Sequence, residues 1–202
     1  MGPKGREKGE EAFLPLFLWK RYWGVGMDRI LYVSDLDGTL LNENQEVSPY
    51  TARVINRMVE AGGLFSYATA RSFVTASKAT AGVTARLPAA VYNGAFVAEF
   101  PTGQLLRTNT FSPGEGREIL ETLLSSGISP IVYSLLKGRE RFSYVRGSVS
   151  PGAAEFLQTG QGDIRQRPVK TPEELAEGEI FYFTCIDEEE KLRPLYETWK
   201  GR

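Results

Sequence analysis

The sequence contains no histidine and only one cysteine, Cys185, among its 202 residues. Without histidine there can be no Ser-His or Cys-His catalysis and no histidine-ligated metal site. A single cysteine cannot form a disulfide within the chain, which fits a reducing compartment, so we expect a cytoplasmic location. Acid–base chemistry must then depend on carboxylates, lysines, tyrosines or metal-bound water.

An excess of charge of one sign is also lacking. The 24 Lys and Arg residues nearly balance the 25 Asp and Glu residues, and the formal net charge is -1. Such a chain has no excess of positive charge to attract a polyanion, so nucleic acid is not an expected partner. Hydrophobic residues make up 42% of the chain. That fraction is enough for a packed core and excludes a disordered protein.

The N-terminal part contains a short apolar run, Phe13–Trp19, which Pro15 interrupts. The run is too short to cross a bilayer, so no membrane partner is expected. Acidic residues precede it, which is atypical of a signal peptide. Met27 comes just before the first convincing strand. We therefore interpret residues 1–26 as an extension outside the fold and hypothesise that the native start is downstream.

The first half of the chain alternates strand and helix patterns. Apolar or β-rich runs predict three strands, the first of them buried, and N-cap and glycine signals bound two helices. The strands are expected at 30–33, 64–68 and 89–92, and the helices from Ser48-Pro49 to Gly62-Gly63 and over 72–81. This order predicts βαβ crossovers and a parallel sheet.

After Gly94 the pattern changes to an α+β arrangement with hairpins rather than crossovers. We expect a hairpin over 96–106, strands at 131–133, 142–145 and 180–185, and helices at 115–124, from a capping box at 171–174, and over 188–199. The domain change is placed near residue 95. The predicted organisation is therefore a first domain over 27–94 and a second over 95–202.

Polar groups follow the end of each predicted parallel strand: Asp35 and Asp37, then Thr69, then Asn93. Ligands of such sheets bind at the carboxyl ends of the strands. Asp35 and Asp37 are separated by one residue, so on an extended segment both carboxylates can face the same crevice. Gly38 permits a tight turn beside them.

The acidic turn has two alternative interpretations. An EF-hand loop also begins Asp-x-Asp, but it requires glycine at its sixth position, where this chain has Leu40. A polar turn without function is the second, because two acids and a glycine commonly form one. The full octet Ser34–Leu41 after a strand, within a βαβαβ pattern, favours phosphate chemistry.

The motifs resemble those of the haloacid dehalogenase superfamily of phosphohydrolases, and most closely its Cof-type, subfamily IIB, sugar-phosphatase-like branch. Asp35–Leu41 matches the first motif of that family residue for residue, Ala68–Ser72 resembles the second, and Tyr92–Ala95 resembles the segment before the cap. The resemblance covers residues 27–202. It implies an α/β fold: a Rossmann-like parallel-sheet core with an inserted α+β cap domain of C2 type, here incomplete.

The resemblance also implies catalytic roles. Asp35 would be the nucleophile that forms an aspartyl-phosphate, and Asp37 would be the general acid and base. Asp35 and the backbone carbonyl of Asp37 would hold Mg²⁺, a cation that prefers oxygen ligands. A small phosphorylated metabolite, with a sugar phosphate as the default, would be the substrate.

The same resemblance assigns phosphate and substrate contacts. Thr69 would bind phosphate through its hydroxyl, and backbone N–H groups at Gly38 and Ala70 would add donors. Arg71 and Asn93 are candidate substrate-binding residues. For Arg71 pairing with a surface acid is an equal alternative, and for Asn93 a plain Asn-Gly turn is favoured.

Two further family motifs, a lysine and a late acidic pair, are not found. Lys137, Lys191 and Lys200 do not match by position, and Asp187–Glu190 is interpreted as the start of a solvated helix. We therefore expect a C-terminally truncated chain whose sheet has an uncovered edge, with poor stability and little or no phosphatase activity. A phosphomutase or phosphotransferase relative, or a non-catalytic binding fragment, are the alternatives.

Several other side chains receive structural interpretations. Tyr133, Phe142 and Tyr144 could line a substrate pocket, but at strand spacing they are expected to belong to the core. Cys185 lies in the apolar run Ile180–Ile186 and is expected to be a small buried hydrophobe, not a nucleophile.

Overall fold

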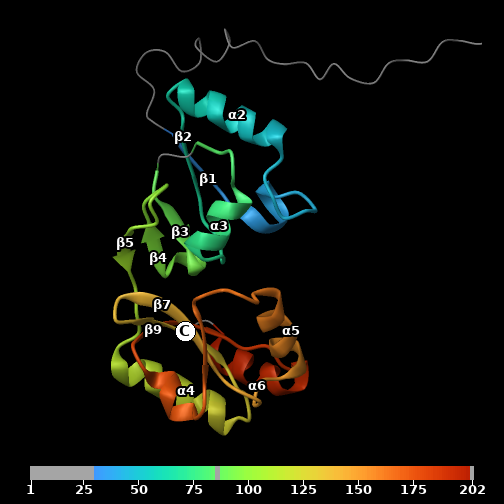
Figure 1. Cartoon of the computed structure of the whole chain (residues 1–202), viewed down its shortest axis with the longest axis vertical. Helices are drawn as coiled ribbons and strands as arrows, with labels where there is room; N and C mark the ends of the chain where they lie inside the picture. Colours follow the sequence, from blue (N-terminus) through green and yellow to red (C-terminus); the bar gives the residue numbers. More distant parts are fainter. Residues whose placement is uncertain (1–29, 85–86, 201–202) are drawn as a thin grey trace, which may run out of the picture. The chain divides into compact units, whose positions relative to one another are not determined.

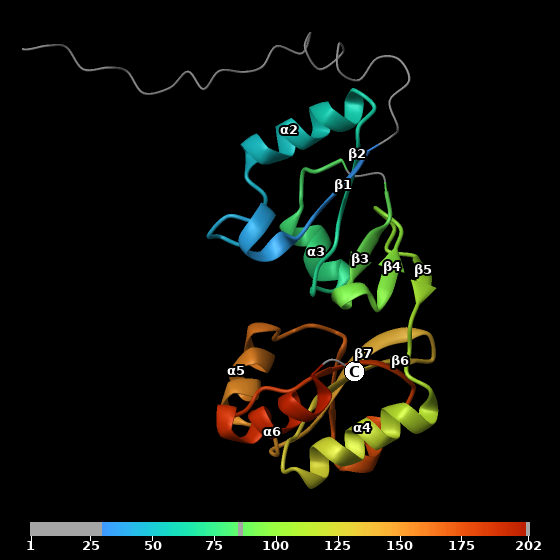
Figure 2. The same cartoon turned by 180° about the vertical axis from the view of Figure 1, so that it is seen from behind.

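The computed structural model describes residues 30–84 and 87–200, so the expected extension over residues 1–26 lies outside the described residues. The chain divides into two compact units, Met1–Leu105 and Leu106–Arg202 (Figures 1 and 2). The expected domain change near residue 95 precedes this division. Within the described residues, no helix has the length and apolar character needed to cross a bilayer.

The first unit follows the predicted strand–helix alternation. Its elements, in chain order, are β1 (Leu31–Ser34), η1 (Leu36–Leu40), α2 (Pro49–Glu60), β2 (Leu64–Tyr67), α3 (Phe73–Ala79), β3 (Ala89–Val91), η2 (Tyr92–Gly94) and β4 (Phe96–Ala98). The next strand, β5 (Leu105–Thr108), begins at the last residue of the first unit and continues into the second. β1 and β2 are parallel, and a parallel bridge between Ala68 and Ala90 joins the end of β2 to β3. β4 then pairs antiparallel with β3, and β5 lies next to β4. The predicted parallel arrangement and hairpin are both confirmed.

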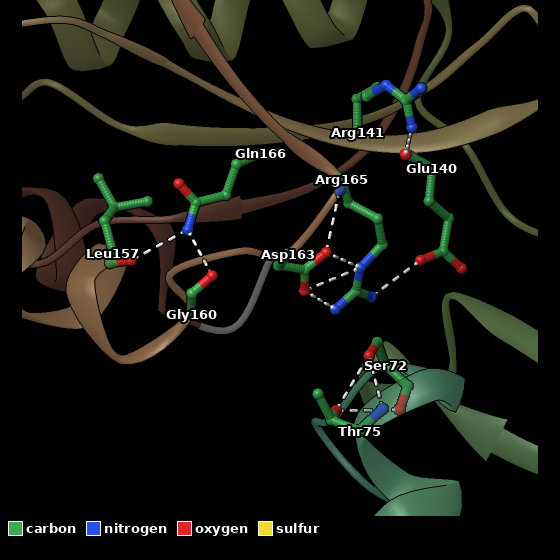
Figure 3. Close-up of polar contacts among 9 residues, drawn as sticks. All are labelled: Ser72, Thr75, Glu140, Arg141, Leu157, Gly160, Asp163, Arg165 and Gln166. Carbon is green, nitrogen blue, oxygen red and sulfur yellow. Dashed lines mark hydrogen bonds and ion pairs between the residues drawn. The ribbon is translucent and has the colours of Figure 1, made fainter.

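Serine residues fix the starts of both helices in this unit. The Ser48 side chain accepts a hydrogen bond from the Thr51 backbone N–H at 3.1 Å, and the Ser72 side chain accepts one from Thr75 at 3.2 Å (Figure 3). These bonds satisfy N–H groups that a helix leaves without partners at its first turn. Pro49 occupies the first turn of α2, where its missing N–H costs nothing.

The core of the first unit lies between α2 and β2. Ala52 and Ile55 of α2 pack with Phe65 of β2 and with Val47 and Val83. The prediction that the first strand is buried is wrong: Leu31, Tyr32 and Val33 of β1 are 42–54% exposed. The cause is the topology, because within the described residues β1 has β2 as its only strand neighbour.

The second unit is built on a four-stranded sheet in the order β8-β7-β6-β9. Its elements are α4 (Pro113–Ser125), β6 (Ile131–Leu136), β7 (Arg139–Val145), α5 (Pro151–Thr159), β8 (Gln166–Val169), η3 (Pro172–Ala176), β9 (Glu179–Thr184) and α6 (Glu189–Trp199). β6 pairs antiparallel with β7 and β9, whereas β7 and β8 are parallel. The expectation of hairpins alone was therefore wrong, because α5 forms a crossover between two parallel strands.

Helix α4 and the turn η3 cover one face of this sheet. Leu120 of α4 and Leu175 of η3 pack against Val132, Val145 and Ile180 of the strands. Ile131 and Val132 of the central strand β6 are fully buried. The second unit therefore has a sheet with a well-covered face, in contrast to the exposed β1 of the first unit.

Candidate functional site

The acidic turn directly follows β1. The Asp35 carboxylate accepts a hydrogen bond from its neighbour's N–H at Leu36 (2.7 Å), and the chain then closes a wide turn in which the Leu41 N–H donates to the Leu36 carbonyl (3.0 Å). Gly38 has a φ of +71°, a conformation that glycine adopts without strain. The turn leaves both Asp35 and Asp37 exposed. Two carboxylates from one short segment thus lie at the carboxyl end of a parallel strand.

Asp37 forms a bidentate ion pair with Arg71. The Arg71 Nε donates to Asp37 Oδ2 at 2.8 Å, and its Nη2 donates to Asp37 Oδ1 at 2.6 Å. Nη2 also donates to Gln45 Oε1 at 3.1 Å. The hydrogen bonds from Arg71 lower the pKa of Asp37 below its ordinary value, against the opposing effect of partial burial. Of the two interpretations of Arg71, the structure shows pairing with an acid, and the acid belongs to the candidate site.

The second motif lies beside β1 and β3 through backbone hydrogen bonds. The Ala68 N–H donates to the Ser34 carbonyl (2.9 Å), and the Thr69 N–H donates to the Ala90 carbonyl (3.0 Å). The Thr69 hydroxyl accepts from the Arg71 N–H at 3.2 Å, and its residue is 4% exposed. Ala70 is exposed, and no acceptor for its N–H occurs among the described residues. This loop therefore presents a free backbone donor next to the acidic turn.

The third strand end is a turn that binds back onto the second motif. The Tyr92 N–H donates to the Arg71 carbonyl and the Asn93 N–H donates to the Thr69 carbonyl, both at 3.0 Å. Tyr92 and Asn93 have φ values of +52° and +53°, which are uncommon for residues with side chains. Asn93 therefore lies in a turn, which is the interpretation that the sequence favoured. Its backbone N–H, not its side chain, makes the hydrogen bond to Thr69 described above.

The oxygen donors of the acidic turn suit a magnesium ion. Asp35 offers a carboxylate, while the carboxylate of Asp37 is occupied by Arg71 and leaves its backbone carbonyl. Mg²⁺ commonly takes one or two carboxylates and keeps several waters. Within residues 30–84 and 87–200, no group of three or more His, Cys, Asp or Glu residues converges to hold a metal. The residues present thus fit part of a Mg²⁺ site.

The structural roles predicted in the second unit hold in part, because Tyr144 and Cys185 are only half-buried. Tyr133 and Phe142 are buried with ring centroids 5.5 Å apart. Burial raises the pKa of the Cys185 thiol to about 11, so it is a poor nucleophile. The Asp187 carboxylate accepts from the Glu188 N–H at 2.8 Å and pairs with Lys191 at 3.0 Å. Asp187 therefore stabilises the start of α6.

A partly buried charged cluster lies on the second unit, around Arg165 (Figure 3). The Arg165 guanidinium binds Asp163 through two nitrogens, with Nη2 2.6 Å from Oδ2, and its Nη1 lies 3.1 Å from Glu140 Oε2. The guanidinium also lies 5.8 Å from the ring centroid of Phe142. Nε, Nη1 and Nη2 of Arg165 each donate to one of these two carboxylates, so the cluster links Glu140 of β7 to the segment that leads into β8.

A hollow is also found on the second unit. It has a volume of about 510 Å³ and lies beside the start of α4, with Glu115, Arg117 and Glu179 among its lining residues. The Glu115 carboxylate already accepts a hydrogen bond from the Ser112 N–H at 3.0 Å. The hollow shares no residue with the acidic turn, so it does not belong to the candidate site.

Sequence reasoning missed one residue of this site, Gln45. Its side chain accepts from Arg71, and its own φ is +60°. The Asn42 side chain accepts from the N–H groups of Asn44 (2.9 Å) and Glu46 (3.3 Å), which shapes the turn around Gln45. The polar run Asn42–Glu46 signals a turn, but nothing in it signals a contact to Arg71.

A parallel βαβ order with an acidic turn after its first strand defines an α/β protein with its site at the carboxyl ends of the strands. Residues 32–200 match the haloacid dehalogenase-like hydrolase family. The match covers most of the chain, so the chain belongs to the haloacid dehalogenase-like hydrolase family. The resemblance read from the motifs is confirmed at this level.

Solved structures share the fold at low sequence identity. A Thermotoga maritima protein matches with a TM-score of 0.66 and 22% identity, over 85% of this chain and 61% of that protein. A haloacid dehalogenase superfamily phosphatase of Bacteroides thetaiotaomicron gives 0.66 and 18%, over 95% and 65%. A subclass IIB sugar phosphatase gives 0.58 and 15%, over 83% and 62%. The predicted α/β fold class is therefore confirmed.

A curated relative is more similar in sequence over a shorter stretch. It is a Mycoplasma pneumoniae protein that is named as a phosphatase, and it is 29% identical to this chain over 133 residues. The aligned stretch is 65% of this chain and 45% of the relative. The chain thus spans less than half of that relative and under two thirds of the Thermotoga protein.

Proposed function

We propose that this chain carries the nucleophile and the acid–base residue of a Mg²⁺-dependent phosphomonoesterase that acts on a small phosphorylated metabolite. The observation that carries the proposal is the exposed Asp35-x-Asp37 turn at the end of a parallel strand, beside the Thr69–Arg71 loop. Family membership supports the reaction class. The likeness to a sugar phosphatase supports a sugar phosphate as the default substrate.

The first half-reaction forms a covalent intermediate. A carboxylate oxygen of Asp35 attacks the phosphorus, and the bond from phosphorus to the substrate oxygen breaks. Asp37 in its protonated form gives its proton to that leaving oxygen. Because Arg71 favours the carboxylate form of Asp37, the ion pair between them has to loosen at this step.

The second half-reaction returns the enzyme to its starting state. Water attacks the phosphorus of the aspartyl-phosphate, Asp37 takes a proton from that water, and Asp35 leaves as a carboxylate. Asp35 and the Asp37 carbonyl would hold Mg²⁺, which supplies positive charge that offsets the repulsion between nucleophile and phosphate. The Thr69 hydroxyl and the N–H groups of Gly38 and Ala70 would hold the phosphate oxygens.

The proposal is tested by trapping the intermediate, since we expect turnover by the 202-residue chain to be slow. The chain is incubated with p-nitrophenyl phosphate and a panel of sugar phosphates, with MgCl₂ or with EDTA, and then acid-quenched. Mass spectrometry should find a phosphoryl group on the peptide that contains Asp35. Asp35→Asn should abolish the adduct, and the rate of product release should fall at least ~10³-fold.

Glu43→Gln is the matched control, because Glu43 is an exposed acid of the same polar segment. It should leave both the adduct and the rate unchanged. Phosphate binding without any adduct or product would favour a non-catalytic binding fragment. Transfer of the phosphoryl group to an added sugar, faster than to water, would favour a phosphotransferase.

A further inference from the structure

We propose that Arg71 is a positioning residue that holds the Asp37 carboxylate in one orientation beside Asp35, and that Gln45 in turn holds the Arg71 guanidinium. The proposal rests on the function proposed above and assigns a role to two residues that carry out no chemistry themselves. The geometry that points to it is the two-point contact between the planar guanidinium and the Asp37 carboxylate.

Two parallel N–H···O bonds fix a carboxylate more completely than one, because they prevent rotation of the carboxylate about its own axis. Asp37 needs such a restraint, since its side chain is 52% exposed. Among the described residues of the turn, none donates a hydrogen bond to its carboxylate. The orientation of Asp37 is therefore set by a residue 34 positions away.

Arg71 is itself held at three points. Its carbonyl accepts from the Tyr92 N–H (3.0 Å), its N–H donates to the Thr69 hydroxyl (3.2 Å), and its Nη2 donates to Gln45 (3.1 Å). Its side chain is only 20% exposed. An arginine whose backbone and guanidinium are both held by hydrogen bonds can act as a rigid support for a neighbouring carboxylate.

The arrangement of Gln45 completes this chain of contacts. The Gln45 N–H donates to the Asn42 carbonyl at 2.9 Å, and Gln45 has a left-handed φ of +60°, so Gln45 lies within a tight turn. The turn that follows the acidic segment thus reaches the Arg71 guanidinium. Removal of the Gln45 amide should loosen Arg71 without removing either bond to Asp37.

The first experiment measures orientation without any need for turnover. In the full chain, three-bond NMR couplings to the Asp37 carboxyl carbon report its χ1 angle. We expect one staggered rotamer in the wild-type chain and averaged couplings in Arg71→Lys, which keeps the charge but loses the two-point fork. A single unchanged rotamer in Arg71→Lys would overturn the proposal.

The second experiment measures catalysis in p-nitrophenyl phosphate hydrolysis. Arg71→Ala should lower kcat at least ~10-fold with little change in KM, and added guanidinium should restore part of the loss. Gln45→Ala should lower kcat by a smaller factor. Arg53→Ala, an exposed arginine of α2, is the control and should have no effect. A rise in KM with kcat unchanged would instead assign Arg71 to substrate binding.

The two experiments separate the two proposals. A wild-type chain with one Asp37 rotamer and neither adduct nor turnover would overturn the proposed function and leave the orientation role supported. An active wild-type chain whose kcat is unchanged in Arg71→Ala would overturn the positioning role and leave the proposed function supported.

Discussion

The central strand of the second unit and the first strand of the first unit differ in how their positions are maintained. In β6, Ile131 and Val132 are fully buried, and Val132 packs in the same cluster as Leu120 of α4 and Leu175 of η3. In β1, Leu31 and Val33 are about half exposed, and backbone hydrogen bonds and one ion pair supply the order around its end. The strand that carries the candidate chemistry is thus the less covered of the two. Its geometry depends on directional bonds, which a single substitution can remove.

The largest expected difference is in the cost of removing a core side chain. Leu123→Ala in α4, where Leu123 is 1% exposed, should destabilise the second unit by about 3 kcal/mol. Leu31→Ala in β1, where Leu31 is 50% exposed, should cost the first unit less than ~1 kcal/mol. Hydrogen exchange resolved by peptide measures both units separately. Equal losses would show that β1 is covered in solution.

The next effect concerns the two arginine clusters. Asp163→Asn removes the two-point partner of Arg165, whose side chain is 12% exposed, and should cost the second unit about 2 kcal/mol. Asp37→Asn removes the corresponding partner of Arg71 at a more exposed position, and should cost the first unit less than ~1 kcal/mol. Urea unfolding followed by the same exchange measurement compares them. Glu189→Gln, in an exposed pair of α6, is the control with no expected change.

Removal of a helix cap should destabilise the two units equally. Ser112→Ala breaks the capping box of α4, in which Ser112 and Glu115 exchange hydrogen bonds, and Ser48→Ala removes the cap of α2. Each should cost its own unit about 1 kcal/mol, since both caps satisfy the same kind of N–H group. Ser148→Ala, an exposed serine between β7 and α5, should cost less than ~0.5 kcal/mol. A much larger loss for one cap would contradict the comparison.

The smallest effect is a pH dependence in the first unit. The pKa of Asp37 is lowered below its ordinary 3.8 in the folded chain, so the ion pair with Arg71 stabilises the unit above that pH. This stability is lost as the pH falls through the lower, folded value. The loss should stay below ~1 kcal/mol because the Asp37 side chain is about half exposed. Urea midpoints at pH 7 and pH 3 should differ less in Asp37→Asn than in the wild-type chain.

Much of the fold was predictable from local signals. The Ser48-Pro49 cap and the stop at Gly62-Gly63 fixed α2, and β-rich runs fixed β2, β6 and β9. The same cap signal, Ser150-Pro151, precedes α5, which was missed. β8 was missed because Gln166, Arg167 and Pro168 lack the apolar and β-branched character of a strand.

Contacts between residues far apart in the sequence could not be predicted from it. An apolar run such as Leu31–Val33 indicates a preference for burial, yet burial depends on whether a neighbouring element exists to cover it. The identity and spacing of Asp35 and Asp37 were enough to predict a catalytic pair. The partner of Asp37 was not, because Arg71 reaches it only after β2 pairs with β1.

In the part of the chain that the structure describes, β1 pairs with β2 alone, and this has a consequence for the behaviour of the chain at high concentration. A strand whose second edge has no neighbour, and whose side chains are apolar, can pair with the same strand of another molecule. Such encounters involve two molecules, so their rate rises with the square of the protein concentration. Dilution should therefore lower the share of molecules that pair through β1.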